Sequence, residues 1–293
     1  MKRIIDQLIE ERAPWLNRSG TGVDAARKTL HLLLQYERTV KIAETLAPMP
    51  AAHVMQSLAD RIARHVEVTG LERVPLRGPA LVVCNHPTGI ADGIVLYAAL
   101  AQVRPDLFYF ANADAIRVLP QLADIIAPVE WRPERRTHKQ NRETMAYAHR
   151  AFSGGRLGVL FPSGRLAKRH GLSLHERPWM ASAAMMARKF NLPVVPMHIT
   201  ARNSVLFYLF DRLHPSLRDI TLFHEVLNKT RQPYRLTLGA PIDPTTLPSG
   251  SAEAIEVLRA RTLELGGEKP QTVLTAPRIL APGGRLRIQR RTA

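Results

Sequence analysis

The first 64 residues carry apolar side chains at the spacing of amphipathic helices. In LHLLLQYERTVKIAETL and in HVMQSLADRIARHV the apolar positions recur three and four residues apart, which places them on one side of a helix. Such a segment either caps a core domain or lies as an amphipathic ramp in a membrane interface. The pattern alone leaves both interpretations open.

From about residue 65 the pattern changes to short apolar strands that alternate with helices. We expect strands in HVEVTG, ALVVCN, DLFYFAN, RLGVLFP, VVPMHIT and YRLTLGAPI, and helices in ADGIVLYAALAQV, KQNRETMAYAHRAFSGG, PWMASAAMMARKF and SAEAIEVLRARTLEL. A further apolar helical stretch is expected to run to about Ile126, and a mostly helical insertion from about Asn203 to Thr230. This alternation predicts a layered α/β fold with buried strands.

The chain is therefore expected to have three parts. Residues 1–64 form an N-terminal helical cap or membrane-docking segment, residues 65–265 the α/β domain, and residues 266–293 a basic tail. From Leu265 onward six Lys and Arg stand against a single Glu in a segment rich in Pro and Gly, so the tail is expected to be flexible.

The charge balance indicates anionic partners. Lys and Arg number 41 against 25 Asp and Glu, a formal net charge of +16, which attracts nucleic acid or anionic lipid and leaves the fold undetermined. The single cysteine, Cys84, excludes an intramolecular disulfide and suits a reducing compartment. Acids within MKRIIDQLIEERAPW argue against a secretory signal, and no uncharged apolar window is long enough for a spanning helix. We therefore expect any membrane contact to be at the surface.

One polar loop combines a histidine with an aspartate. NHPTGIADG follows the strand ALVVC, and ligands usually bind outside the carboxyl ends of sheet strands. Pro87 ends the strand, Gly89 permits a tight turn, and Asp92 falls in the first turn of the next helix. If the turn folds Asp92 onto His86, the carboxylate fixes the imidazole tautomer and makes His86 a general base for a hydroxyl. The alternative is that Asp92 caps the helix and His86 is an ordinary turn residue.

A second loop, PSGRLAKRHG, follows the strand RLGVLF and is rich in cations. Its candidate anion-binding residues are Ser163, Gly164, Arg165, Lys168, Arg169 and His170. An arginine can grip a phosphate or a carboxylate through two N–H groups at once, whereas the alternative is a solvated basic loop. A base on one strand end and an anion grip on another suit a transferase whose hydroxyl acceptor carries a charged group.

Together these motifs resemble the glycerolipid acyltransferases, the family of lysophosphatidic acid acyltransferase. NHPTGIADG resembles the first block of the family, FPSGR the third and LPVVPMHI the fourth, and HVEVTGLERVPLRGPALVVCNHP is similar to the usual approach to the first block. VPMHITARNSVLFY resembles a branch of haemolysin-like and lyso-ornithine lipid acyltransferase proteins. The resemblance covers roughly residues 65 to 245. It implies an α/β fold with a mixed, largely parallel sheet flanked by helices, preceded by the N-terminal helical segment.

The resemblance also implies an O-acyltransferase that moves a fatty acyl group from acyl-ACP or acyl-CoA to the hydroxyl of a lyso-lipid. His86 would be the general base and Asp92 its orienting partner, with no acyl-enzyme, metal or cofactor. Backbone N–H groups near the helix start would stabilise the oxyanion. The implied partners are a lyso-lipid acceptor, an acyl carrier protein or CoA thioester, and an anionic membrane surface. The enzyme would be cytoplasmic and peripheral on the inner face of the cell membrane.

Departures from the family pattern affect the predicted acceptor site. Five residues separate His86 from Asp92, one more than is usual, and the haemolysin-like branch shares this longer form. Ser163 stands where most relatives have Glu, and Arg165 stands one place earlier than the family arginine. The second block maps loosely onto IIAPVEWR, whose arginine is either a head-group contact or a solvated surface residue. The predicted substrate-binding residues are Asn85, Arg132, Ser163, Gly164 and Arg165.

Other reactive side chains have simpler explanations. Cys84 and His86 form a thiolate–imidazole pair if they share a face, but a lone cysteine in an apolar strand is more often a core residue. His198, within VVPMHIT, is expected to be a buried core histidine, since no metal-ligand spacing occurs in the sequence. The helix that carries Met180, Met185 and Met186 is expected to be core, with an acyl-chain groove as the alternative. WRPERRTHKQNR is a solvated basic stretch or a contact for anionic head groups.

The sequence also allows two functions other than lipid acyl transfer. The net charge suits a nucleic-acid-binding protein, but the sequence has no helix-turn-helix signature, zinc spacing or RNP-like aromatic motif, so no nucleic-acid partner is expected. The missing Glu in the third block motivates a catalytically silent member of the same fold that binds a lipid or a partner. Lyso-lipid acyl transfer remains the leading prediction.

Overall fold

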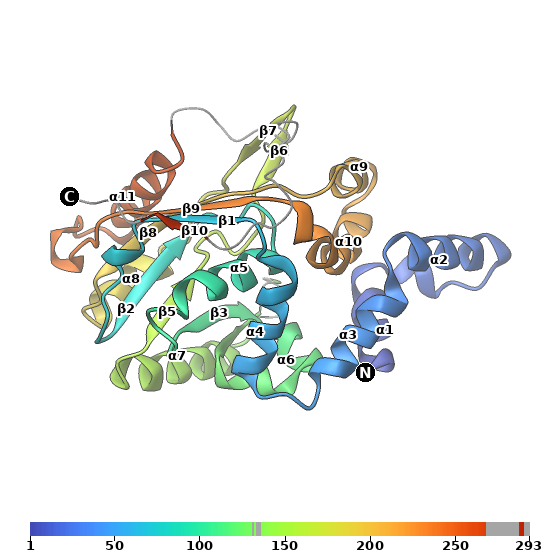
Figure 1. Cartoon of the computed structure of the whole chain (residues 1–293), viewed down its shortest axis with the longest axis horizontal. Helices are drawn as coiled ribbons and strands as arrows, with labels where there is room; N and C mark the ends of the chain where they lie inside the picture. The colour runs from blue at the N-terminus through green and yellow to red at the C-terminus, as the bar shows by residue number, and fades with distance from the viewer. Residues whose placement is uncertain (131, 133–135, 268–286, 290–293) are drawn as a thin grey trace.

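The chain begins with helices and continues as an α/β domain (Figure 1). The computed structural model describes residues 1–130, 132, 136–267 and 287–289. The N-terminal part consists of α1 (Lys2–Arg12), the 3-10 turn η1 (Pro14–Asn17), α2 (Thr21–Leu33), α3 (Tyr36–Leu46) and α4 (Ala51–Ile62). The predicted helical character of this segment agrees with these elements.

A mixed, largely parallel sheet forms the centre of the α/β domain. Its strands are β1 (Val66–Thr69), β2 (Ala80–Cys84), β3 (Phe108–Asn112), β4 (Ile126–Val129), β5 (Leu157–Leu160), β8 (Val194–Thr200), β9 (Tyr234–Leu238) and β10 (Arg287–Gln289). Within the described residues their order is β10-β1-β9-β8-β2-β5-β3-β4. Neighbours run parallel except β8 and β9, which are antiparallel. The expected fold class is confirmed.

The side chains of β2 show why this strand is apolar throughout. Successive residues of a strand point to opposite faces of the sheet, so Val82 and Cys84 face one side while Leu81 and Val83 face the other. All four side chains are fully buried. A strand that is buried on both faces requires a continuous apolar run instead of alternation, as ALVVC has.

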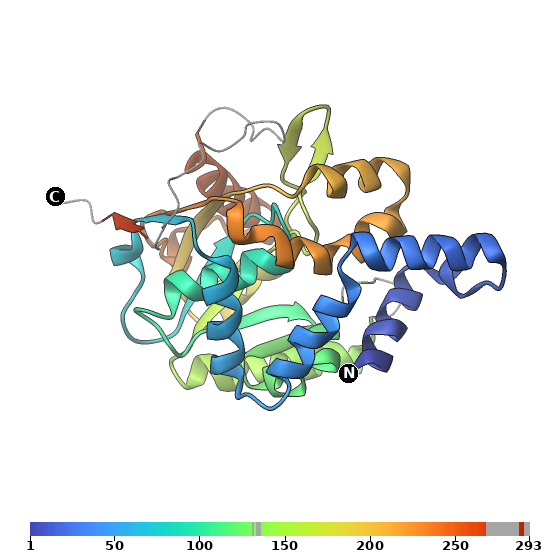
Figure 2. The same ribbon diagram turned by 45° about the vertical axis from the view of Figure 1, so that its right-hand side comes forward.

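Helices cover both faces of the sheet (Figures 1 and 2). The helices of the domain are α5 (Ile90–Leu100), α6 (Asp114–Val118), α7 (His138–Ser153), α8 (Ser182–Lys189) and α11 (Ser251–Glu264). The residues Val54 of α4 and Ile94 of α5 pack in the cluster that contains Val82. The helices α7, α8 and α11 contribute to the cluster on the opposite face, which contains Leu81. This three-layer arrangement leaves the carboxyl ends of the strands for loops.

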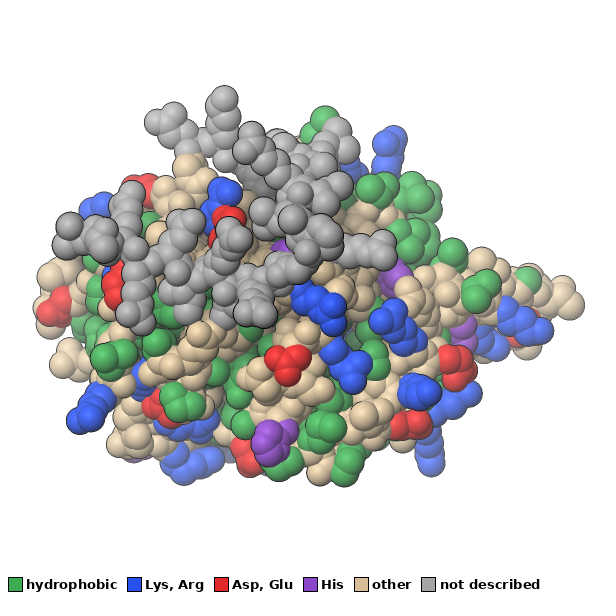
Figure 3. All heavy atoms as spheres, in the orientation of Figure 1, with side chains coloured by type: hydrophobic (Ala, Val, Ile, Leu, Met, Phe, Trp, Pro, Cys, Tyr) green, Lys and Arg blue, Asp and Glu red, His purple; other side chains and the backbone are tan. Residues whose placement is uncertain are grey.

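The helical insertion between β8 and β9 packs beside a hairpin that the sequence did not predict. The insertion consists of α9 (Val205–Leu213) and α10 (Pro215–Asn228), and the hairpin of β6 (Lys168–His170) and β7 (Ser173–His175). Leu174 of the hairpin packs with Phe207 and Tyr208 of α9. The hairpin and α9 therefore form one surface, and in Figure 3 hydrophobic side chains gather over it. Three-residue strands joined at Gly171, whose φ is +57°, are too short for a detectable alternation.

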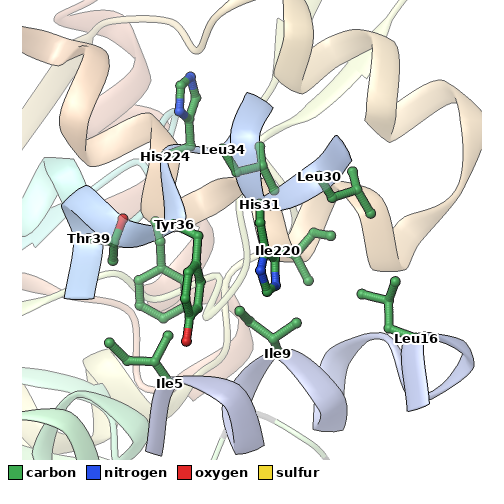
Figure 4. A pocket seen from close by; sticks show the side chains of 11 residues that line it. Ile5, Ile9, Leu16, Leu30, His31, Leu34, Tyr36, Thr39, Ile220 and His224 are labelled. Carbon is green, nitrogen blue, oxygen red and sulfur yellow. The ribbon is translucent and has the colours of Figure 1, made fainter. Parts of the chain in front are cut away.

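The N-terminal helices pack on the insertion. Leu16 and Leu30 form a small core with Phe210 and Ile220 of α9 and α10. Between α1, α2, α3 and α10 lies an apolar cavity, where the rings of His31 and Tyr36 stack with their centroids 4.2 Å apart (Figure 4). The apolar side chains of η1 and α2 in this core are thus buried against the insertion. No helix in the described ranges is long and apolar enough to cross a bilayer.

Two stretches differ from the predicted elements or lie outside them. The apolar stretch expected to be helical up to about Ile126 instead contains α6, a 3-10 turn η3 (Pro120–Asp124) and the start of β4. Pro120 at the start of this turn lacks the N–H that would continue the helix. The tail prediction for 266–293 falls mostly on residues outside the described ranges, but β10 within it pairs in parallel with β1.

Candidate active site

The two predicted loops lie side by side because their strands are neighbours. β2 and β5 pair in parallel, with Val83 opposite Leu160, so the loops that follow these two strands begin at the same edge of the sheet. The backbone N–H of Ala167 then donates to the carbonyl of His86 at 2.8 Å. The ring of Phe161 stacks on the His86 imidazole with centroids 4.2 Å apart. The structure thus brings together NHPTGIADG, which we call the histidine loop, and PSGRLAKRHG, which we call the arginine loop.

His86 and Asp92 are in direct contact. Nδ1 of His86 lies 2.9 Å from Oδ2 of Asp92, and Asp92 is fully buried in the first turn of α5. The same carboxylate accepts the backbone N–H groups of Thr88 at 2.9 Å and Gly89 at 3.0 Å, and the Thr88 hydroxyl bonds its other oxygen. Four hydrogen bonds therefore fix the carboxylate, and Nδ1 is the nitrogen that it orients.

The turn between these two residues needs a glycine. Gly89 has φ of +94°, which L side chains rarely adopt. A Cβ on Gly89 would lie 3.2 Å from the side chains of both Leu166 and Leu222. The turn therefore folds Asp92 back onto His86 and lies against an apolar wall supplied by the arginine loop and α10. The N–H groups of Thr88 and Gly89 are both donated to Asp92.

Tyr234 and Glu176 support the pair from distant parts of the sequence. The hydroxyl of Tyr234 lies 2.8 Å from that of Thr88 and is fully buried, which raises its pKa well above the ordinary value. Glu176 accepts the backbone N–H of His86 at 3.1 Å and the Trp179 indole N–H at 3.0 Å. Neither residue was predicted, because their only sequence signal is a lone polar side chain far from the motifs.

Burial raises the pKa of Glu176 and is the largest effect, whereas the hydrogen bonds from the His86 backbone N–H and the Trp179 indole lower it. The arginine loop has Ser163 where most relatives have Glu, and the carboxylate that contacts the histidine loop is that of Glu176. Ser163 itself is buried and donates its hydroxyl to the carbonyl of Arg165 at 2.8 Å. Its role in the geometry is to hold the turn.

Asn85 joins two strands. Its side-chain N–H donates to the carbonyl of Ile199 at 3.0 Å, and its oxygen accepts the N–H of Ile199 at 2.7 Å. The residue is buried at the end of β2, and both ends of its amide are used by β8. This places Asn85 behind the site as a brace between the histidine loop and the neighbouring strand.

The arginine loop, which packs on His86 through Phe161 and Ala167, presents a cationic group to solvent. Gly164 and Arg165 are exposed, and Gly164 has φ of +59°. Arg177, at the end of the hairpin, donates Nε–H to the carbonyl of Leu166 at 2.9 Å. Burial and then the positive charges of Arg165 and Arg218 lower the pKa of Arg177. Two guanidinium groups, those of Arg165 and Arg177, therefore act on the same region.

Arg132 lies elsewhere. It follows β4, the edge strand, which is separated from β2 by β5 and β3, about 14 Å at the usual strand spacing. Its guanidinium donates to Glu130 at 2.9 Å and to Glu11 at 3.3 Å. The structure does not bring it to His86, and its contacts connect the α/β domain to α1.

Of the other reactive side chains, Cys84 and His198 are in the core, whereas the core prediction is wrong for Met180 and Met185. Burial raises the pKa of the Cys84 thiol well above its ordinary value, and Asp92 and Glu176 add to this, so Cys84 stays protonated and is a poor nucleophile. Burial lowers the pKa of His198 to about 4, as expected of a neutral core histidine. In α8, Met186 is buried, whereas Met180 and Met185 before and within the helix are exposed. Within the described ranges no three His, Cys, Asp or Glu side chains converge as metal ligands do.

Known proteins are similar to this chain over the region that holds both loops. A family model described as Acyltransferase matches residues 65–200, which span both loops. A lyso-glycine lipid O-acyltransferase of Phocaeicola vulgatus is 27% identical over 203 residues, which are 65% of this chain and 71% of the relative. A protein of the same name from Bacteroides thetaiotaomicron is 25% identical over 183 residues, which are 60% of this chain and 65% of the relative.

A solved structure has the same fold. The 1-acyl-sn-glycerophosphate (LPA) acyltransferase PlsC of Thermotoga maritima superposes with a TM-score of 0.50 over 84% of this chain and 98% of its own, at 16% identity. This likeness concerns the fold alone. The matched family model and the sequence relatives support an O-acyltransferase of the glycerolipid acyltransferase family.

Proposed function

We propose that this enzyme transfers a fatty acyl group from an acyl thioester to the hydroxyl of a lyso-lipid, with His86 as general base. The observation that carries the proposal is the 2.9 Å contact between Nδ1 of His86 and the fully buried Asp92. Because Nδ1 faces the carboxylate, Nε2 is the nitrogen left to accept a proton. His86 retains partial exposure, so a substrate hydroxyl can reach it.

The reaction proceeds in one displacement. Nε2 of His86 takes the hydroxyl proton as the acceptor oxygen attacks the thioester carbonyl. The carbon–sulfur bond then breaks, and the departing thiolate takes the proton from the imidazolium. Asp92 stabilises the imidazolium through its contact with Nδ1. The N–H groups of Ile90 and Ala91 begin α5 without intrahelical partners and are our candidates for the oxyanion donors.

The acceptor that we propose is a lyso-lipid with an anionic head group, such as a lyso-aminolipid or a lysophospholipid. The names of the sequence relatives support a lyso-lipid that contains an amino acid. We expect Arg165 and Arg177 to supply the positive charge that binds the carboxylate or phosphate of this lyso-lipid. The donor is acyl-ACP or acyl-CoA, and the net charge of +16 favours acidic ACP. We place the enzyme in the cytoplasm, peripheral on the inner membrane face.

The test is acyl transfer by the purified enzyme with both donors and a panel of lyso-lipids, followed by mass spectrometry of the products. We expect a diacylated product from at least one acceptor, and loss of turnover in His86→Ala. His53→Ala is the matched control, since His53 is exposed on α4. Full turnover by a folded His86→Ala enzyme would remove His86 as base, and lyso-lipid binding without turnover across donors would favour the catalytically silent alternative.

A further inference from the structure

The helix α9 exposes a continuous apolar stripe. Val205, Leu209 and Leu213 are 72%, 51% and 62% exposed, and their spacing of four residues places them along one side of the helix. The opposite side buries Phe207 and Phe210. Single exposed apolar side chains are ordinary on a protein surface, but three in one stripe indicate an interaction site.

The β6–β7 hairpin extends this apolar surface. Leu172 at its tip is 53% exposed, and Leu174 anchors the hairpin to α9 by packing on Phe207. In Figure 3, hydrophobic side chains lie over α9 and at the tip of the hairpin, with Lys and Arg beside them. We call the four exposed side chains Leu172, Val205, Leu209 and Leu213 the docking stripe.

The charges around the docking stripe are positive. Lys168 of β6 and Arg212 of α9 are exposed. The acid of α9, Asp211, is only partly exposed and is paired with Arg218 at 3.3 Å. Apolar side chains that are flanked by exposed cations suit the head-group region of an anionic bilayer, where the apolar groups enter the interface and the cations contact lipid phosphates.

The elements that carry the docking stripe pack against the histidine loop. The segment that leads into the hairpin bonds the carbonyl of His86 through Ala167, and Leu166 packs on Gly89 beside Leu222 of α10. Packed apolar side chains therefore connect the exposed helix to the histidine loop. A bilayer on the stripe would present a lyso-lipid to His86 without full extraction into water.

We propose that α9 and the β6–β7 hairpin are the membrane-docking face of this enzyme, and that the docking stripe inserts into an anionic bilayer. The inference that docking turns the active site toward the lyso-lipid rests on the proposed function, whereas the docking itself does not. The sequence allowed the N-terminal helices to be the membrane-docking segment instead. Leu16 and Leu30 of this part are buried on the insertion. Only α2 leaves a comparable pair exposed, Leu32 and Leu33, among the N-terminal helices.

The experiment is co-sedimentation of the full chain with vesicles of phosphatidylcholine alone or of an equal mixture with phosphatidylglycerol. We expect binding to the anionic vesicles, and at least a roughly tenfold weaker partition for the variant V205S/L209S/L213S. L32S/L33S is the matched control and should bind as the wild type does. Lys168→Gln with Arg212→Gln should weaken binding to the anionic vesicles alone. Circular dichroism and thermal melting confirm that each variant is folded.

Turnover on lyso-lipid in detergent micelles separates this inference from the proposed function. The α9 variant should keep its kcat in micelles while it loses vesicle binding, whereas an inactive wild type would contradict the function and leave the docking result standing. The inference is overturned if the wild type does not bind anionic vesicles. It is equally overturned if L32S/L33S detaches while the α9 variant stays bound, or if the α9 variant binds vesicles normally and loses only its affinity for acyl-ACP.

Discussion

The carboxylate of Glu176 accepts the backbone N–H of His86 at 3.1 Å. Ninety residues separate the two in sequence, and Glu176 follows directly after the β6–β7 hairpin. Because Glu176 also accepts the Trp179 indole N–H, its carboxylate ties the histidine loop to the segment before α8. We interpret Glu176 as a positioning residue that acts on the reaction through His86.

Glu176→Gln replaces a charged acceptor with a neutral one. Hydrogen bonds to charged groups contribute about 1.5–3 kcal/mol, so we expect kcat to fall about tenfold or more with KM nearly unchanged. A purely structural role would lower stability and leave the kcat of the folded enzyme intact. Glu44→Gln, an exposed change on α3, is the control. Steady-state kinetics at saturating donor separates the two results.

The same variant changes the pH dependence of stability. Burial raises the folded-state pKa of Glu176 above its unfolded value, so its contribution is fully present below the unfolded pKa and is lost as pH rises through the folded pKa. Glu176→Gln should therefore lose less stability than the wild type as pH rises from about 4.5. Urea unfolding over that range measures the difference, and parallel curves for both proteins would contradict the assignment.

The hydroxyl of Thr88 connects Asp92 to Tyr234. Since Asp92 accepts from Thr88, the Tyr234 hydroxyl donates to Thr88. Thr88→Val leaves both partners unsatisfied in the core, whereas Tyr234→Phe removes only the terminal donor. We expect a stability loss of about 1–3 kcal/mol for Thr88→Val and about 1 kcal/mol for Tyr234→Phe.

Chemical denaturation of both single variants and the double variant checks this chain of hydrogen bonds. The double variant should be about as stable as Thr88→Val alone, because Tyr234 acts through Thr88. Additive losses would show that the two hydroxyls are independent. Tyr97→Phe is the control, as its hydroxyl bonds a backbone carbonyl of α4 at 3.3 Å.

Substitutions of Arg165 and Arg132 are expected to change KM differently, because only Arg165 is our candidate for the head-group contact. Arg165 is exposed in the loop that packs on His86, whereas Arg132 lies three strands away and bonds Glu130. Arg165→Ala should raise KM for an anionic lyso-lipid about tenfold, with little change for an uncharged monoacylglycerol. Arg132→Ala should leave both KM values near the wild type. A rise of KM for Arg132→Ala alone would place the head group at the sheet edge instead.

The fold was largely predictable because buried strands and amphipathic helices leave strong periodic patterns. The run ALVVC predicts a strand that is covered on both faces, and β2 is such a strand. The hairpin was missed because its strands have three residues each and its apolar positions, Leu172 and Leu174, are too few for a pattern. Its place beside α9 depends on the packing of Leu174 on Phe207, which is a tertiary contact.

The candidate site was predictable where a motif is local. His86 and Asp92 lie in one loop, and a glycine turn with positive φ brings them together. Glu176 bonds the backbone of His86, and Tyr234 bonds the Thr88 hydroxyl. Both come from remote segments, so no spacing rule identifies them. Asn85 was predicted as a substrate contact from its place in the motif, whereas its amide bonds the backbone of β8, a partner that only the strand order reveals.

The measurement that tests the central claim most directly is a double-variant cycle on kcat with His86→Ala, Asp92→Asn and both changes together. The central claim is that Asp92 acts through His86. It predicts that each single change lowers kcat by about 10²- to 10⁴-fold and that the double variant is no slower than His86→Ala. Asp60→Asn, an exposed change on α4, serves as the control. Multiplicative losses, or a folded His86→Ala enzyme at wild-type rate, would contradict the account.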